Sequence, residues 1–431
     1  MNGSKMEFIL NNFPMNGGEK TKSWRRTTIG EQVTLQRGFD ITRIEQRQGK
    51  IPVVSSGGIS SYHDTNAVKG PGVVLGRKGV VGSVYFIKSD YWPHDTTLWV
   101  KDFHGNDPSF VYYFFKYLIP TLTKLDVGSA NPTLNRNHVH PIEILWPPLL
   151  TQHRIAHILS SLDDKIELNR QMNETLEAMA RAIFKSWFVD FDPVRAKAEG
   201  KKPAGMDAET AALFPDSFEE VDEREVPRGW GVGKLGDYAE AVKGLSYKGE
   251  GLCGEGTPLH NLNSVLEGGG YKYRGIKYYD GEFQERHVVK PGDVIVTNTE
   301  QGFDFLLIGY PAIIPRFYGN WGLFTHHLFR IRALPNSPLT NHFIFYLLMT
   351  SSVREQVIGC TNGTTVNMMY IDGLTTPQFI LPSEKTILAF EKIVSPIFTL
   401  VENNEEESSS LAKIRDTLIP ELMSGEIEIF P

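Results

Sequence analysis

A long-range internal repeat is the feature that most constrains what this chain can fold into. The stretch SWRRTTIGEQVTLQRGFD, which begins at Ser23, aligns with GWGVGKLGDYAEAVKGLS, which begins at Gly229, at a single offset of 206 residues. Further matches follow in the same order at offsets of 220 to 233, as expected if the second copy carries loop insertions. The anchoring pairs are Trp24 with Trp230, Gly30 with Gly236, Glu31 with Asp237, Gly38 with Gly244, Pro52 with Pro258 and Pro71 with Pro291. We therefore predict two homologous domains in tandem.

Each copy is rich in short β-type runs such as GVVLG and DVIVTN, separated by Gly, Pro, Asn and Asp. Near its end each copy has one aromatic segment, FVYYFFKYLI and FIFYLLM, which is too short to span a membrane and suits a buried core helix. The pattern predicts an α+β fold, in which each domain has a curved, mostly antiparallel sheet and short helices. Each copy closes with a related stretch, 127–139 and 358–371, which we interpret as a shared junction of a turn and a strand.

A long helical segment follows each copy. In the first, residues 149–192, apolar residues alternate in steps of four and three, and this 3.5-residue period is typical of a left-handed coiled coil. A helix of about 40 residues is roughly 60 Å long at ~1.5 Å per residue, too long for one small domain to cover. The predicted seam is Ile155, Leu159, Leu162, Ile166, Asn169, Asn173, Leu176, Ala180, Ile183 and Trp187.

The second long segment, residues 382–424, has a seam of similar length. Pro396 falls inside it and should kink the helix or end its first turns. Because each helix buries only one stripe, we expect the two to pair as an antiparallel coil whose polar seam residues fix the register; the alternative is two separate surface helices. This seam is Phe390, Val394, Ile397, Val401, Asn404, Ser408 and Leu411, and then slips to Ile414 and Leu418.

These features divide the chain into seven segments. We expect the charged linker to follow the surface, with AALF as one docked turn. The segments are an N-terminal extension (1–23), domain 1 (24–148), the central helix (149–192), a linker (193–226), domain 2 (227–381), the C-terminal helix (382–424) and a tail (425–431).

Charge is distributed unevenly along the 431 residues. The net charge is −7, yet residues 1–150 carry 17 Lys and Arg against 12 Asp and Glu, and residues 227–381 carry 13 of each. The acidic excess lies in 151–226 and 382–431. Two cysteines cannot build a disulfide framework or a four-cysteine zinc site, and no signal peptide is recognisable, so we expect a cytoplasmic protein.

Sequence motifs for catalysis are missing. There is no phosphate-binding loop, no HExxH, no GxSxG and no NPPY-type motif for gripping a flipped base. The single GxGxxG, at Gly231, Gly233 and Gly236, follows a linker and reads as a domain-entry turn. The adjacent His326 and His327 lie in a strand-like run, where their side chains should face opposite ways. We expect no catalytic site, no metal and no cofactor in this chain.

Two related domains held apart by paired helices suit a polymer with regular features, such as duplex DNA. DNA readers commonly place two modules about 34–36 Å apart, a spacing that a ~60 Å coil can set. Since the two copies differ in detail, we expect them to read different halves of an asymmetric, bipartite target.

Several segments together resemble the specificity subunit of Type I restriction–modification systems. They are LWPPLLTQHRIAHILSSLDDKIELNRQMNETLEAMARAIFKSWFVDFDPVRAKAEG, the FPDSFEE…VPRGW linker, VVSSGGIS…GPGVVLGRKGVVG and LAKIRDTLIPELMSGEIEI. The resemblance covers all but the first twenty or so residues. It implies two target-recognition domains, an antiparallel coil, and no catalysis in the chain itself. It also implies partner methyltransferase subunits that methylate adenine with S-adenosylmethionine, and restriction subunits that join them. The second copy departs from the pattern, with TNTEQG where the first has GRKGVVG.

Candidate DNA contacts are polar or basic residues in loops, where Arg and Lys can contact guanine or phosphate and Asn can read adenine. Domain 1 supplies Ser55, Ser56, Gly57, Gly58, Arg77, Lys78, Arg136 and Asn137. Domain 2 supplies Lys243, Tyr247, Lys248, Asn261, Asn263, Lys272, Tyr273, Arg274, Asn298 and Thr299. Two alternatives remain: a two-headed protein–protein scaffold, favoured by the neutral second domain, and a lone DNA methyltransferase, for which no cofactor motif is present.

Overall fold

The computed structural model describes residues 23–125, 133–301, 304–363 and 366–427. The chain forms two compact units, residues 1–167 with 408–431, and residues 168–407. The expected N-terminal extension, apart from Ser23, and residues 127–132 of the first junction lie outside the described residues. Within the described part, no helix is long and apolar enough to cross a membrane.

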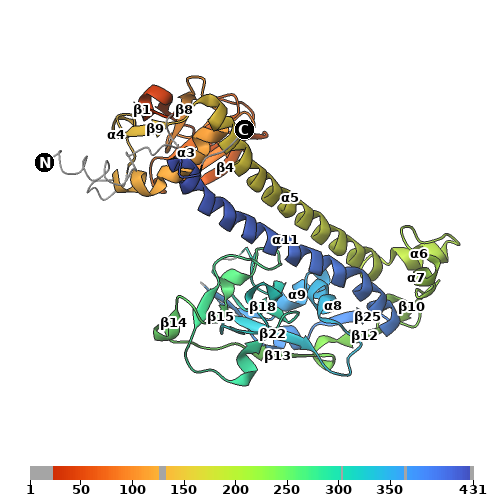
Figure 1. Cartoon of the computed structure of the whole chain (residues 1–431). Helices are drawn as coiled ribbons and strands as arrows, with labels where there is room; N and C mark the ends of the chain where they lie inside the picture. The colour runs from red at the N-terminus through yellow and green to blue at the C-terminus, as the bar shows by residue number, and fades with distance from the viewer. Residues whose placement is uncertain (1–22, 126–132, 302–303, 364–365, 428–431) are drawn as a thin grey trace. The chain divides into compact units, whose positions relative to one another are not determined.

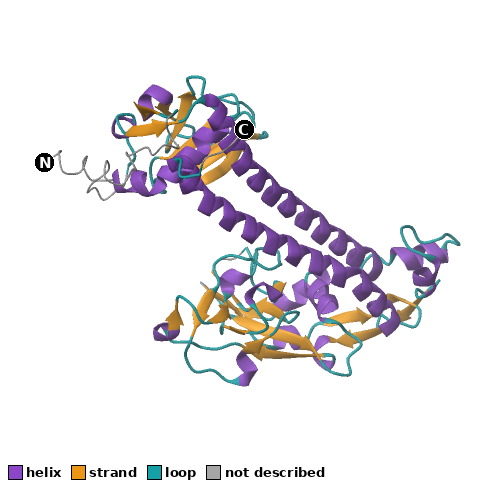
Figure 2. Cartoon of the chain, viewed as in Figure 1, coloured by secondary structure: helices purple, strands orange, loops and turns teal. Residues whose placement is uncertain are grey.

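In the described part of the first unit, the strands form three small sheets (Figures 1 and 2). Strand β1 (Arg25–Thr28) pairs antiparallel with β9 (Glu143–Trp146). A four-stranded antiparallel sheet has the order β2-β8-β5-β6, and a three-stranded sheet has the order β4-β3-β7 with β3 and β7 parallel. The bounds are β2 Thr34–Arg37, β3 Ile51–Ser55, β4 Gly58–His63, β5 Gly72–Gly76, β6 Val84–Ile87, β7 Trp92–Pro93 and β8 Thr97–Asp102; the short helices are α2 Ile29–Gln32, α3 Pro108–Leu122 and α4 Arg136–Val139.

The second unit repeats this topology strand for strand. Strand β12 (Gly231–Lys234) pairs with β25 (Gln378–Leu381), the sheet β13-β22-β18-β20 corresponds to β2-β8-β5-β6, and β16-β15-β21 corresponds to β4-β3-β7, including the parallel pair. The bounds are β13 Ala239–Lys243, β15 Thr257–His260, β16 Lys277–Tyr279, β18 Val294–Thr297, β20 Pro311–Ile313, β21 Gly322–Phe324 and β22 Leu328–Ala333.

The second copy also has elements beyond this shared plan. Strands β14 (Leu252–Cys253) and β17 (Val288–Val289) extend the β15 sheet, and a separate antiparallel sheet has the order β19-β24-β23. The remaining bounds are β19 Thr299–Gln301, β23 Thr361–Asn362, β24 Val366–Met369, α8 Asn341–Leu348, α9 Ser351–Gly359 and α10 Asp372–Thr375.

The repeated glycines have a structural cause. A Cβ on Gly38 would lie 2.1 Å from the carbonyl oxygen of His94, and a Cβ on Gly244 would lie 2.3 Å from that of Thr325. Both contacts are to backbone that cannot move independently of its strand, so only glycine fits. The two units therefore share this close contact between a glycine and the backbone of a neighbouring turn, in addition to the repeated sequence.

The aromatic segments form buried helices, as predicted. In the first unit Phe110, Phe114 and Phe115 of α3 are at most 2% exposed, and the ring of Trp146 packs edge-on against Phe110 and Phe114. Because the hydrophobic effect scales with buried apolar area, these aromatic side chains contribute much of the stability of the unit. In the second unit Phe343 of α8 has the same role and contacts Phe184 of the central helix.

Two long helices follow the two copies, α5 (Leu149–Phe188) and α11 (Glu384–Ser424). In the first unit Arg415 of α11 pairs with Asp163 of α5, and Tyr113 donates a 2.6 Å hydrogen bond to the same carboxylate. In the second unit Asn169 of α5 lies beside Asn404 of α11. In each unit the contacts run antiparallel, so these helices form the expected antiparallel coil.

Polar residues occupy the middle of the seam in the second unit. Asn404 donates to the amide oxygen of Asn173 at 2.8 Å, and Asn173 donates to Glu405 at 2.9 Å. Asn169 is fully buried and donates to Glu407 at 2.8 Å. The other predicted seam residues up to Leu411 are buried or half-buried.

Several details of the helical segments differ from the prediction. The first helix ends at Phe188, not 192, because Phe191 takes a left-handed conformation (φ 57°) before the short helix α6 (Asp192–Ala198). Pro396 does not end α11; it lies on an exposed face, where water can satisfy the carbonyl that loses its partner. Ile414 is 49% exposed, and half-buried Arg415 lies beside it.

The linker is more structured than expected. It contains α6, the short helix α7 (Ala208–Ala212) and the hairpin β10–β11 (Phe218–Val221 and Arg224–Pro227). Phe214, the last residue of AALF, is buried and its ring lies 5.0 Å from that of Trp187.

Candidate nucleic-acid interface

One turn occurs at the same place in both units and organises the candidate interface. We call these two segments, His94–Thr96 and Thr325–His327, the paired turns; each connects the parallel strand of its unit (β7 or β21) to the next strand (β8 or β22). The amide of Arg77 donates to the carbonyl of Thr96 at 2.9 Å, and the amide of Asn298 donates to that of His327 at 3.0 Å. The paired turns therefore place Arg37, Arg77 and Lys78 of the first unit at the same positions as Lys243, Asn298 and Thr299 of the second.

In the first unit, arginines gather around this turn. The Arg37 guanidinium donates to the carboxylate of Asp95 at 2.7 Å, and that of Arg77 donates to the carbonyl of Asp95 at 3.4 Å. Partial burial and the neighbouring positive charge of Arg37 lower the pKa of Arg77. Lys78 is exposed, and its backbone bridges to Thr133. Arg37 is absent from the sequence-based candidates because it ends a strand and lies in no recognisable loop.

In the second unit, Lys243 stands where the first unit has Arg37, but the other basic side chain comes from a different position. The rings of His326 and His327 lie 4.0 Å apart, and burial together with His326, Lys243 and Lys277 lowers the pKa of His327. Lys277 of β16 also donates to the hydroxyl of Tyr247 at 3.0 Å. The sequence interpretation of the histidine pair was wrong: these residues form a turn, so their rings lie side by side, tilted by 39°, instead of facing opposite sides of a strand.

Some predicted contacts have internal structural roles. Asn298 is 2% exposed and its amide donates to the carbonyl of His326 at 3.0 Å, while the hydroxyl of Thr299 lies 3.0 Å from Nδ1 of His327. Asn261 is also buried, and its side chain accepts from the amide of Asn263. These three side chains are too enclosed to reach a duplex in this conformation and instead hold the surrounding loops.

The serine–glycine segment of domain 1 forms the β3–β4 turn. The Ser55 hydroxyl donates to the carbonyl of Gly58 at 3.0 Å, and the carbonyl of buried Ser56 accepts from Ser83 and Tyr85 at 2.7 and 3.1 Å. Gly58 adopts φ +106°, a conformation that L side chains rarely adopt. The other exposed candidates are Gly57, Arg136, Asn137, Lys248, Asn263, Lys272 and Arg274, of which Lys272 donates to Asn263 at 2.7 Å.

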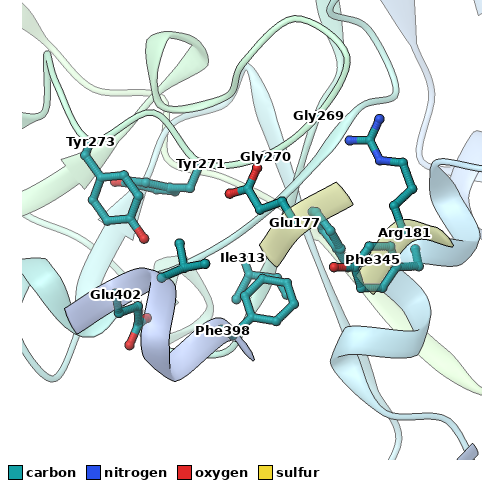
Figure 3. Close-up of a pocket in the computed structure, with 12 residues that line it drawn as sticks. Glu177, Arg181, Gly269, Gly270, Tyr271, Tyr273, Ile313, Phe345, Phe398 and Glu402 are labelled. Atoms are coloured by element: carbon teal, nitrogen blue, oxygen red, sulfur yellow. The ribbon is translucent and has the colours of Figure 1, made fainter. Parts of the chain in front are cut away.

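Tyr273 lies away from the candidate interface, in the wall of a small cavity beside the long helices (Figure 3). Figure 3 shows it next to Tyr271, with Glu402 of α11 nearby. The cavity has a volume of about 40 Å³, enough for a few water molecules and too small for a drug-sized ligand. Burial raises the pKa of Glu402. Partial desolvation also raises the pKa of Glu177, whose side chain still reaches solvent. We interpret the cavity as a small packing gap where the loop that carries Tyr271 and Tyr273 meets the long helices.

One group of side chains has the composition of a metal site. Ligand atoms of Asp40, His94 and Asp95 lie within 4.8 Å of one another. Asp95 already pairs with Arg37, and exposed acidic groups of this kind are common in the absence of a metal, so the group does not by itself define a cation site.

Comparison with known proteins shows to which family this chain belongs. A family described as the Type I restriction modification DNA specificity domain matches residues 22–178. The HindI Type I restriction enzyme specificity subunit of Haemophilus influenzae is 31% identical over 344 residues, covering 69% of this chain and 71% of that protein. The chain belongs to the Type I restriction–modification specificity subunits. The MjaIX specificity subunit of Methanocaldococcus jannaschii is 26% identical over 328 residues, covering 74% of this chain and 69% of the other.

The solved structure of a Type I specificity subunit from M. genitalium has the same fold. It covers 93% of this chain and 96% of its own length with a TM-score of 0.58, at 16% sequence identity. As a specificity subunit, this chain has a role in DNA specificity.

Proposed function

We propose that each unit reads one half of an asymmetric, bipartite DNA target through the surface around its paired turn. The supporting observation is a group of basic side chains around each paired turn: Arg37, Arg77 and Lys78 in one unit, and Lys243 and Lys277 in the other. Lys and Arg neutralise phosphates and orient a reader on the duplex. Arg37 and Lys243 occupy equivalent positions, but the other basic residues do not, so the two half-sites should differ in sequence.

The long helices set the half-site spacing and dock the methyltransferase subunits. On α5, apolar side chains outside the seam also face solvent in the second unit: Leu168, Met172 and Met179 are 50%, 42% and 52% exposed. These side chains lie outside the seam that contacts α11. A row of exposed apolar residues along one helix suits burial against a partner protein.

The chain itself is non-catalytic in this proposal. S-adenosylmethionine would be bound by the methyltransferase subunits, which methylate adenine, and restriction subunits would join the assembly in the cytoplasm. Supporting this division of labour, the sequence has no cofactor-binding or base-flipping motif.

The salt dependence of DNA binding tests the proposed interface. We expect Arg77→Ala with Lys78→Ala to weaken binding of the assembled complex to its target and to reduce the slope of log K against log salt by up to about 2, since each lost phosphate contact changes it by roughly 0.9. Fluorescence anisotropy at several salt concentrations measures this slope.

A matched control is Lys50→Ala with Lys101→Ala, two exposed lysines at the strand ends away from the paired turn. An unchanged slope in the first variant would show that this loop does not contact phosphate. If the wild-type complex binds every duplex equally and no bipartite sequence competes better than another, the protein–protein scaffold becomes the better explanation.

A further inference from the structure

The small sheet β19-β24-β23 of the second unit presents an apolar face beside the paired turn Thr325–His327. Along β24, Val366 and Met368 are 42% and 47% exposed, whereas Asn367 and Met369 are 5% and 3% exposed. This alternation is that of a strand with one face on the protein and the other in solvent. Val366 and Met368 therefore place two neighbouring apolar side chains in solvent on the same face of the sheet.

The face also contains an amide. In the β23–β24 pairing, Asn362 lies opposite Met368, and directly opposed residues of an antiparallel pair share one face of the sheet. Asn362 is exposed like Met368. The β23–β24 strand pair therefore presents a carboxamide, which can both donate and accept, next to a long apolar side chain.

Hydrogen bonds on its other side anchor strand β24 of this pair. The amide of Met369 donates to the carbonyl of Asn298 at 2.8 Å, and β24 pairs with β19 from Thr299 to Gln301. Within β19, the buried carboxylate of Glu300 accepts hydrogen bonds of 2.8 to 2.9 Å from the three consecutive backbone amides of residues 306–308. A surface fixed in this way loses little conformational entropy when it binds.

The same residues connect the strand pair to the cations. Asn298 and Thr299 bond to His326 and His327, and His327 lies within electrostatic reach of Lys243 and Lys277. Basic residues beside a narrow face with an amide and apolar groups suit a DNA duplex, in which phosphates border the base edges. The major groove admits a two-stranded β-ribbon.

We propose that the β23–β24 strand pair enters the major groove of the second half-site and reads an A·T base pair. Asn362 would bond to N6 and N7 of adenine, and Met368 would contact the C5-methyl group of thymine, which are the groups by which A·T differs from the other pairs in this groove. This inference rests on the proposed function, since it requires the second unit to bind DNA.

Replacement of thymine by uracil tests the proposal, because uracil lacks only the methyl group. We expect one uracil substitution in the second half-site to weaken binding of the assembled complex about fourfold, from ~0.8 kcal/mol for one buried methyl group. In the Met368→Ser complex the same substitution should have no effect, and Asn362→Ala should lose discrimination at the same base pair.

Leu334→Ser is the control variant, since Leu334 is an exposed apolar residue just beyond the far end of β22. It should retain the wild-type response to uracil. The inference is wrong if no uracil position in the second half-site weakens wild-type binding, or if Met368→Ser responds as strongly as wild type. If either of these results is obtained but the wild-type complex still binds one bipartite sequence specifically, the proposed function stands and only the inference about β23–β24 is wrong. A wild-type complex that binds all sequences equally would contradict both the proposed function and this inference.

Discussion

Individual residues in this protein owe their roles to the partners that surround them in the folded chain. His260 is an example: it ends β15, it is 1% exposed, and its Nδ1 lies 2.7 Å from the hydroxyl of Tyr271. Burial lowers the pKa of His260 to about 3 and raises the pKa of Tyr271. Both side chains are therefore neutral at physiological pH, and they act as a hydrogen-bonded pair in the core of the second unit.

The pH dependence of stability should report on His260. Its pKa is lower in the folded chain than the ordinary value of 6.5, so the unfolded chain binds the proton more readily. The free energy of unfolding should therefore fall as pH falls below 6.5, by up to about 1.4 kcal/mol per pH unit, until pH approaches 3. Denaturant unfolding between pH 7 and 5 measures this. In His260→Gln this contribution to the pH dependence of the free energy of unfolding should disappear. If the variant shows the same dependence on pH as the wild type, the buried imidazole is not its source.

At the scale of elements, the polar layer of the coil is the feature with the clearest energetic consequence. An amide in a helical seam costs stability compared with leucine but disfavours registers in which it would be left without a partner. Here Asn173 and Asn404 satisfy each other across α5 and α11. The layer therefore specifies which turns of the two helices meet in the second unit.

Removing one amide of this pair should lower the stability of the protein more than replacing both. Asn173→Ala leaves the amide of Asn404 without its acceptor, and we expect a loss of about 1–3 kcal/mol. The double change Asn173→Leu with Asn404→Leu should recover that stability or exceed it, because the seam becomes fully apolar. Thermal unfolding of both variants measures the difference. As a control, Thr175→Ala at an exposed position should change the free energy of unfolding by no more than about 0.5 kcal/mol. If Asn173→Ala also leaves the free energy of unfolding unchanged, the Asn173–Asn404 hydrogen bond does not have this role.

At the scale of the whole molecule, each unit has its own hydrophobic core. One core gathers Phe110 and Phe115 with Ile155 of α5 and Leu422 of α11; the other gathers Phe343 with residues of the same two helices, such as Phe184 and Phe390. Each long helix therefore contributes a different part of its length to each core. Such separate cores favour separate cooperative units of unfolding.

A core truncation should consequently destabilise one unit more than the other. Phe343→Ala, a change that costs about 3–5 kcal/mol at a fully buried position, should reduce amide protection mainly in residues 168–407. Phe115→Ala should give the converse pattern, in residues 23–167. Hydrogen exchange followed by mass spectrometry distinguishes the two. Equal loss of protection across the chain in both variants would indicate a single cooperative unit.

The sequence by itself determined the large features of this protein. Repeat offsets, strand punctuation and a 3.5-residue period are local or long-range patterns of residue type, and they predicted two related α+β domains and an antiparallel coil. The same patterns located Gly38 and Gly244 without showing that each is required by a carbonyl oxygen of a distant turn. Family resemblance, carried by contiguous segments, was likewise readable from the sequence.

Only the tertiary structure decided which polar residues are available to a ligand. Asn298 and Thr299 have the composition of a recognition loop, yet they are buried because their partners, His326 and His327, lie 28 residues further along the chain. Conversely, Met368 has the composition of a core residue, and the pairing of β24 with its neighbours turns it toward solvent. Exposure depends on which strands meet, and no pattern of residue types within one segment contains that information.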